Sequence, residues 1–290
     1  MWGCVRHSRG AYLLAALLML GAVTTAMAGP GPPRRVVSIN LCTDRLALAL
    51  AGPGQLHSVS HLSLDPRVSP VAKAARAHVI NRGQAEEIFL MRPDLVLVST
   101  FTRRSTVTML RRLGLRVVEF SPAHTLDDVR RNIRRMGAVL GRQEAAARLL
   151  ARFDARLAAL RPPDDAPRPR AVIYQANGFV SGPGSLPGQI LSAAGFTNAA
   201  AEAGYGAGQK MPLEVLALSA PDLVVIAQPY PGGSRAEAVL AHPVLRALTQ
   251  EGRGARVTVP DQAWICGTPL VLDALERLTR ARRALTGGAP

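Results

Sequence analysis

Histidine and cysteine are among the side chains of this chain that could ligate a metal. Of its six histidines, only His57 and His61 stand at a ligand-like spacing of four residues. They straddle the end of an expected strand, where alternation places both on one face. No third partner for them can be located, so the pattern predicts no metal site. We expect His61 to line a ligand cleft and His57 to be structural.

The chain also lacks the residue patterns of common enzymes. It has no Gly-x-Ser-x-Gly elbow, His-Glu-x-x-His pair, phosphate loop or Cys-x-x-Cys motif. Ser185, in SGPGSLPG, has glycine neighbours but the wrong spacing for an activated nucleophile. Because no acid–base set can be assembled, we predict a binding protein without a cofactor rather than an enzyme.

Aromatic and polar side chains gather in loops, where no core periodicity calls for them. In open parallel sheets, ligands bind beyond the carboxyl ends of the strands. Aromatic faces suit a corrin, porphyrin or catecholate, and arginines suit an anionic chelate. The predicted ligand-binding residues are Asn40, Thr43, His61, Phe101, Arg103, Arg104, Phe179, Tyr205, Tyr230 and Trp264.

The elements that must position these loops follow an α/β pattern. Short apolar strands alternate with helices in two parts of the chain, which predicts mostly parallel sheets in two Rossmann-like lobes. From Leu126 to Leu160 the apolar spacing is helical, with a break at Gly141. The predicted divisions are a signal peptide at 1–28, an N-terminal α/β lobe at 29–124, a helical spacer at 125–162 and a C-terminal α/β lobe at 163–290.

The first 28 residues have the features of a cleavable signal peptide. Arg6 and Arg9 precede the apolar stretch Tyr12–Val23, and Ala26-Met27-Ala28 forms a small-x-small cleavage site. The apolar stretch is too short to span a membrane. We therefore expect a soluble, exported chain that begins near Gly29 and functions in the periplasm.

A formal net charge of +15 raises the question of nucleic-acid binding. Of the 35 basic residues only two, Lys73 and Lys210, are lysines, and the arginine pairs fall on the polar faces of expected helices. No aromatic residues are interleaved with them to stack on bases. We therefore interpret the charge as solvated helix faces and predict no nucleic-acid partner.

One segment occurs twice. Residues 85–99 read AEEIFLMRPDLVLVS and residues 213–227 read LEVLALSAPDLVVIA. In each copy a glutamate, Glu86 or Glu214, stands seven residues before Pro-Asp-Leu-Val. A proline that ends a helix and a buried strand of Leu and Val account for the second half of the segment. The matched glutamates are not explained in this way. In the first turn of each helix a glutamate offsets the positive end of the helix dipole, but its identical position in both copies needs a further explanation.

Taken together, these features resemble class III periplasmic binding proteins of ABC importers for cobalamin, ferric siderophores and haem. The resemblance rests on VVSINLCTDRLALALAG, IFLMRPDLVLVS and QILSAAGFTNAA, in that order, and covers about residues 35–285. It implies two lobes bridged by one rigid helix, placed here at Gln143–Leu160, with the ligand between the lobes. It also implies that Glu86 and Glu214 dock onto arginines of a permease dimer in the inner membrane.

The resemblance leaves the ligand open. We expect an iron–siderophore or related metal chelate because of Arg103 and Arg104, with cobalamin or haem as alternatives in the same cleft. An exported ligand-sensing module without a transporter would keep the cleft but would not need Glu86 and Glu214. The binding protein itself is expected to be a monomer.

Cys42 and Cys266 follow the first and the last expected strand, so each lies on a cleft-facing loop of its own lobe. Three interpretations stay open. The first is a disulfide between the lobes, which an oxidising compartment favours. The second is a pair of free thiols. In the third, one cysteine is a thiolate ligand of haem iron, cobalt or a soft metal. A disulfide would close a loop of about 225 residues, which is worth about 5 kcal/mol in the chain-entropy model.

Overall fold

The computed structural model describes residues 2–3, 31–228, 234–249 and 254–287. The chain divides into two units, Met1–Gly31 and Pro32–Pro290, and all helices and strands described below belong to the second. The predicted signal peptide lies almost entirely outside the described residues. Within the described part, no helix is both long and apolar enough to cross a membrane.

The first sheet has five strands, all parallel, at the N-terminal end of this unit. β4 reads LVLVS and is buried along its whole length, as expected of a central parallel strand. The strand order is β3 (Val79–Asn81), β2 (Leu56–Ser60), β1 (Val36–Ser38), β4 (Leu95–Ser99) and β5 (Val117–Phe120).

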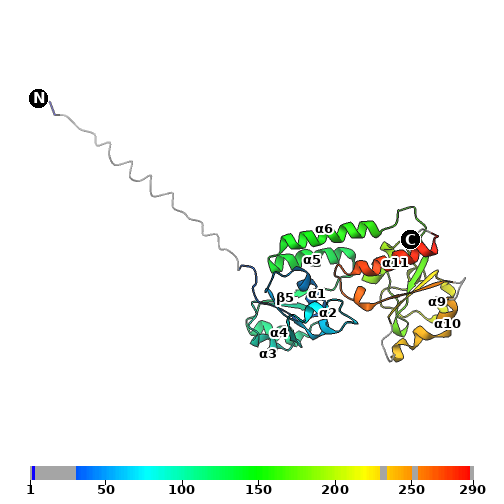
Figure 1. The fold of residues 1–290 in the computed structure, drawn as a ribbon, viewed down its shortest axis with the longest axis horizontal. Helices are drawn as coiled ribbons and strands as arrows, with labels where there is room; N and C mark the ends of the chain where they lie inside the picture. Colours follow the sequence, from blue (N-terminus) through cyan, green and yellow to red (C-terminus); the bar gives the residue numbers. More distant parts are fainter. Residues whose placement is uncertain (1, 4–30, 229–233, 250–253, 288–290) are drawn as a thin grey trace. The chain divides into compact units, whose positions relative to one another are not determined.

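Helices connect these strands and cover both faces of the sheet (Figure 1). α1 begins after Asn40, whose side chain caps it by accepting a hydrogen bond from the Cys42 backbone. We refer to this sheet and its helices as the N-lobe. Its helical segments are α1 (Leu41–Leu50), η1 (His61–Leu64), α2 (Ala72–Ala75), α3 (Ala85–Leu90) and α4 (Arg104–Arg112).

Two long helices follow, α5 (Leu126–Leu140) and α6 (Gln143–Leu160), with the bounds that the sequence predicted. Thr125 and Asp128 form a capping box at the start of α5, and Gly141 ends it in the left-handed region with φ 67°. In Figure 1 α5 and α6 run side by side. A Cβ on Gly137 would overlap Ala146, so the glycine lets the two helices approach closely.

The second sheet has four parallel strands, and we refer to it and its helices as the C-lobe. Its strand order is β7 (Thr197–Asn198), β6 (Arg170–Ile173), β8 (Leu223–Ala227) and β9 (Ala255–Val259). Its helical segments are η2 (Ala176–Gly178), α7 (Leu186–Ala193), α8 (Ala199–Glu202), α9 (Leu213–Ser219), η3 (Arg235–Ala241), α10 (Pro243–Leu248), η4 (Asp261–Ala263) and α11 (Val271–Leu285).

One apolar cluster runs through both lobes. It takes one face of each sheet, for example Leu95 and Leu97 of β4 and Leu223 and Val225 of β8, together with side chains of α5, α6 and α11. Arg156 of α6 adds ion pairs to α11. The opposite faces of the two sheets are covered by separate clusters, which include α3 and α4 in the N-lobe and α9 and α10 in the C-lobe.

These contacts agree with the mixed α/β fold of two parallel sheets that the sequence predicts. The residue limits assigned to the lobes and the spacer remain a prediction, because Pro32–Pro290 forms one unit of contacts. The helical spacing of the apolar residues predicts that Leu149, Leu150, Phe153 and Leu157 face inward from α6. Phe153 and Leu157 are buried, whereas Leu149 and Leu150 are only partly buried.

The repeated segment makes the same hydrogen bonds in both lobes. Asp94, in the first copy, accepts from the backbone N–H groups of Arg34 and Arg35 at 2.6 and 3.0 Å. Asp222, in the second copy, accepts from the backbone N–H of Arg170 at 2.7 Å. Each aspartate therefore joins the start of one strand, β1 or β6, to the neighbouring strand that follows the proline. This explains why Asp follows Pro in both copies.

The helix before each proline also ends alike. The residue preceding the proline, Arg92 or Ala220, has a left-handed backbone, with φ of 48° and 41°. For a residue other than glycine this conformation costs about 1 kcal/mol. The same unfavourable turn at the same position shows that the two copies share one backbone path.

An arginine completes each of these turns. Nε of Arg35 donates to the carbonyl of Met91, and Nη1 of Arg170 donates to the carbonyl of Ser219, both at 2.6 Å. These carbonyls lie at the end of α3 and α9, where the helix supplies no further N–H partner. The repeat is therefore an equivalent structural unit in each lobe, from helix to turn to strand.

Candidate functional site

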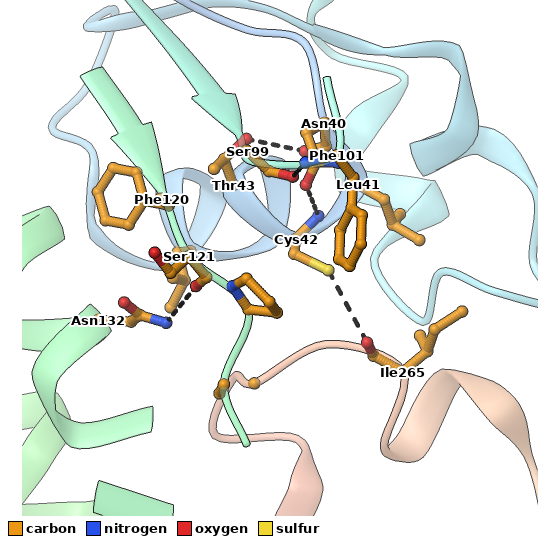
Figure 2. Close-up of a pocket in the computed structure, with 14 residues that line it drawn as sticks. Asn40, Leu41, Cys42, Thr43, Ser99, Phe101, Phe120, Ser121, Asn132 and Ile265 are labelled. Carbon is orange, nitrogen blue, oxygen red and sulfur yellow. Dashed lines mark hydrogen bonds between the residues drawn. The ribbon is translucent and has the colours of Figure 1, made fainter. Parts of the chain in front are cut away.

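A cavity of about 250 Å³ lies at the carboxyl ends of β1, β4 and β5 (Figure 2). Asn40 and Cys42 line it after β1, and Ser99 and Phe101 line it at the end of β4. Ile265, from the C-lobe, closes it on the other side. None of the described residues that line this cavity is charged, and most are apolar. It therefore fits a largely neutral ligand surface.

Several polar groups of this cavity already have partners within the protein. Asn40 Oδ1 accepts from the Cys42 N–H at 3.0 Å, and Thr43 Oγ1 donates to the Asn40 carbonyl at 2.9 Å. Ser99 Oγ accepts from the Phe101 N–H at 3.0 Å. These bonds fix the lining before any ligand arrives, which reduces the entropy lost on binding.

Cys42 and Cys266 form a disulfide, one of the three alternatives that the sequence left open. Their Cα atoms are 5.2 Å apart across 224 positions of sequence, and the bond joins α1 of the N-lobe to the loop before α11 of the C-lobe. Sγ of Cys42 also lies 4.0 Å from the Ile265 carbonyl oxygen. Because this sulfur is bonded to that of Cys266 it carries no proton, so the contact is not a hydrogen bond. Neither sulfur is therefore available as a thiolate ligand.

Two further contacts join the lobes beside the disulfide. Nη1 of Arg45, in α1, donates to the carbonyl of Gln262 at 3.0 Å. Gly267 meets Ala123, and a Cβ at position 267 would overlap that of Ala123. Together with the disulfide, these two contacts restrain the two lobes relative to one another.

Asp44 lies in the interior beside this junction. One carboxylate oxygen accepts from the Ser60 backbone N–H at 3.0 Å and from the Ser63 hydroxyl at 2.7 Å, and Ser60 Oγ also donates to it. Its other oxygen has no hydrogen-bond partner among the described residues. Burial raises the pKa of Asp44 to about 6, although the serines lower it. Burial likewise lowers the pKa of the neighbouring Arg45, to about 10.

A second cavity, of about 450 Å³, lies on the C-lobe side. It shares Ala123 and Ile265 with the first, so a large ligand could contact both. Gln175, Trp264 and Asp261 are among the residues that line it. Trp264 is 4% exposed and belongs to the shared core as well, so its ring is held by packing on one side.

Four of the predicted ligand-binding residues line these cavities. Asn40, Thr43 and Phe101 line the first, and Trp264 lines the second. Phe101 is 79% exposed, which leaves its ring free to contact a ligand. All four lie beyond strand ends, as the rule for open parallel sheets predicts.

The other predicted residues lie elsewhere or outside the described part. Arg103 and Arg104 are exposed at the start of α4, and His61 is exposed at the start of η1. None of the three lines either cavity. Phe179 lies under Lys210 Nζ, 5.3 Å from its ring centre, and Tyr205 packs against the outer cluster of the C-lobe. Tyr230 lies outside the described residues.

His57 has the structural surroundings that the sequence suggests. Nη2 of Arg35 lies 2.8 Å from His57 Nε2, which therefore acts as the acceptor. Burial and then the charge of Arg35 lower the pKa of this histidine. Among the described residues, no group of three His, Cys, Asp or Glu side chains could hold a metal ion.

One loop that lines both cavities contains none of the predicted ligand-binding residues. Residues 121–124 follow β5 and contribute Ser121, Pro122 and Ala123 to the first cavity and His124 to the second. The strand-end rule applies to this loop as well, but small and apolar side chains gave it no chemical signature. Ile265 was likewise missed, although it stands between Trp264 and Cys266.

Glu86 and Glu214 are exposed in the first turns of α3 and α9. Glu87, the neighbour of Glu86, accepts from the Arg82 backbone N–H at 2.8 Å and is therefore used within the N-lobe. That bond separates the roles of the two adjacent glutamates. Glu86 is the one that corresponds to Glu214, both in sequence and in position on its helix.

The chain resembles known proteins along most of its length. It is 27% identical over 271 residues to a cobalamin-binding protein of Halobacterium salinarum, which covers 90% of this chain and 72% of the relative. A periplasmic haem-binding protein from Roseiflexus, in its apo form, matches with a TM-score of 0.68 and 22% identity over 87% of this chain and 99% of its own. The periplasmic vitamin B12-binding protein of Vibrio cholerae matches with a TM-score of 0.64 and 21% identity over 88% and 98%.

These structural matches show that this chain shares the fold of those two proteins. The sequence profile described as "Periplasmic binding protein" matches residues 36–254. This range contains every strand of the two sheets except β9, which begins at the next residue. The chain belongs to the periplasmic binding protein family.

Proposed function

We propose that this protein is the solute-binding component of an ABC importer and that its ligand is a corrinoid of the cobalamin class. It is exported by its signal peptide, captures the ligand between the lobes as a monomer, and delivers it to a permease dimer. The observation that carries the choice of ligand is the absence of Arg and Lys from the described lining of both cavities.

Charge separates the ligand classes. Haem carries two propionates and many ferric siderophores are anionic, so both favour a cationic site. Here the first cavity has a neutral described lining, and the second includes the carboxylates of Glu237 and Asp261. Arg103 and Arg104, which favoured a siderophore in the sequence, lie outside both cavities. The amide-rimmed corrin ring needs no cation.

The apolar surfaces fit the same ligand. Phe101 presents an exposed ring at the first cavity, and Trp264 presents a packed one at the second. Aromatic faces bind flat conjugated rings by stacking. The cobalamin-binding relative from Halobacterium salinarum supports the assignment, since its similarity extends over most of this chain.

Calorimetric titration tests the ligand. We expect cyanocobalamin to bind with a dissociation constant of about 1 µM or tighter, and haemin and ferric enterobactin, both anionic, to bind at least tenfold more weakly. Quenching of Trp264 fluorescence, corrected for ligand absorbance and absent in Trp264→Phe, would place the ligand at the second cavity. Tighter binding of haemin or ferric enterobactin would contradict the corrinoid assignment while leaving the family role intact.

Glu86 and Glu214 are proposed to pair with arginines of the permease, one glutamate for each half of the dimer. Charge-assisted Arg–carboxylate bonds are directional and steer encounter. We expect Glu86→Gln with Glu214→Gln to lower cyanocobalamin uptake by cells at least tenfold, without changing affinity in solution. The matched control is Glu144→Gln, an exposed glutamate on α6. A loss of ligand affinity in the double variant would instead place these residues at the ligand.

A further inference from the structure

Leucines are unusually exposed on the two repeated helices. Of the large apolar side chains described between residues 31 and 287, only three are more than three-quarters exposed: Leu90 at 78%, Phe101 at 79% and Leu218 at 86%. Phe101 lines the first cavity. The other two are not near either cavity, yet they occupy the same position in the repeat, four residues after Glu86 and Glu214.

Helix geometry places each leucine beside its glutamate. Residues four apart lie one turn apart on the same face. The residue between them, Ile88 in α3 and Leu216 in α9, is fully buried against the outer face of its sheet. Each helix therefore turns one apolar side chain into the lobe and presents a carboxylate and a leucine together to solvent.

The surrounding bonds hold both pairs on the same scaffold. In each lobe an arginine binds the end of the helix and an aspartate binds the start of the neighbouring strand. A single exposed leucine on a soluble protein needs no explanation. A leucine at one matched position in two equivalent units, each beside an acidic side chain with no ion pair among the described residues, indicates a binding surface that is used twice.

We propose that Leu90 and Leu218 are apolar anchors that enter matching apolar pockets on the two halves of the permease dimer. This inference rests on the proposed function and names a second element of the same docking surface. The partner it fits is two-fold symmetric, with a cation beside an apolar pocket on each half. The cation pairs with Glu86 or Glu214, and the leucine fills the pocket.

The two contacts reinforce one another. An ion pair between exposed side chains is weak in water and is screened by salt. A leucine seated one turn away excludes water from that pair and adds buried apolar area of its own. We therefore expect each leucine to strengthen docking about tenfold, a contribution that the carboxylates alone do not supply.

Cells that carry single and double variants test the anchors through uptake. At limiting amounts of binding protein, Leu90→Gln and Leu218→Gln should each lower the initial rate of cyanocobalamin uptake about tenfold, and together more strongly. Glutamine has a helix propensity close to that of leucine, so α3 and α9 should remain folded. The affinity for cyanocobalamin in solution should stay within twofold of wild type.

Leu113→Gln and Leu285→Gln are the matched controls, because both leucines are exposed but lie outside the repeat. They should retain wild-type uptake. Wild-type uptake in the Leu90→Gln/Leu218→Gln variant, in cells where the paired glutamate variant is defective, would overturn the anchors but not the docking glutamates.

Photo-crosslinking gives a readout that does not depend on the ligand. Benzoylphenylalanine at position 90 or 218 should crosslink to an integral membrane permease subunit, identified by mass spectrometry, and at position 113 it should not. Crosslinks to a second copy of this chain, or none at all, would overturn the inference. If the wild-type protein neither binds nor imports cyanocobalamin, the proposed ligand fails, and the crosslinks alone decide the anchors.

Discussion

Replacing Cys42 and Cys266 together by serine is expected to lower the free energy of unfolding by about 5 kcal/mol. The disulfide spans 224 positions of sequence, so it closes most of the folded chain into one loop. In the chain-entropy model, a loop of this length removes a large share of the unfolded chain's freedom. Denaturant unfolding of the oxidised protein and of the double variant measures the difference.

The reduced wild-type protein is the control for this prediction. If the bond itself stabilises the fold, wild type in dithiothreitol and Cys42→Ser/Cys266→Ser should unfold at similar denaturant concentrations. A difference of less than about 1 kcal/mol between the oxidised and reduced wild type would contradict the prediction. Intact mass distinguishes the two forms, since the disulfide removes two hydrogens.

The disulfide also bears on how the lobes move. With the Arg45–Gln262 hydrogen bond and the Gly267–Ala123 contact, it is one of three restraints between the lobes. The shared apolar cluster, with α6 packed on α5 and α11, joins the lobes as well. A protein restrained in this way can close over its ligand only modestly, which suits a preformed cavity.

The elements with strong local signals follow their sequence patterns. α5 has a capping box at one end and Gly141 at the other, and β4 and β8 are continuous apolar runs after a Pro-Asp turn. β3 was missed because Val79–Asn81 is short, at the edge of the sheet and mostly exposed. α10 and β7 have similarly short patterns, which only tertiary contacts stabilise.

For the candidate site, sequence located loops better than side-chain directions. The strand-end rule brought Asn40, Thr43, Phe101 and Trp264 to the cavities. The rule could not predict that Arg103 and Arg104 lie at the start of α4 and outside both cavities. The direction of their side chains depends on the residue at which this helix begins. The buried pair of Asp44 and Arg45 also gave no signal, since helix spacing alone would place a charged pair at the surface.

Asp44 is expected to make the stability of this protein fall with rising pH. Burial raises the pKa of its carboxyl to about 6 in the folded protein, against 3.8 for the unperturbed group. Between these values the folded state binds more protons than the unfolded state, so the free energy of unfolding decreases as pH rises. The contribution is complete well below pH 4 and is lost by about pH 7, for a change of about 3 kcal/mol.

Asp44→Asn isolates this contribution. The asparagine oxygen can accept from Ser60 and Ser63 as the carboxylate does, and its amide would occupy the position of the oxygen that lacks a partner among the described residues. Denaturant unfolding between pH 4 and 7 should show wild type losing about 2 kcal/mol relative to this variant, because part of the change falls below pH 4. Asp65→Asn is the control, because Arg67 lowers the pKa of Asp65 to about 2, below that range. A constant difference between wild type and Asp44→Asn would mean that the pKa of Asp44 is the same in the folded and the unfolded chain, so that the hydrogen bonds from its serines offset its burial.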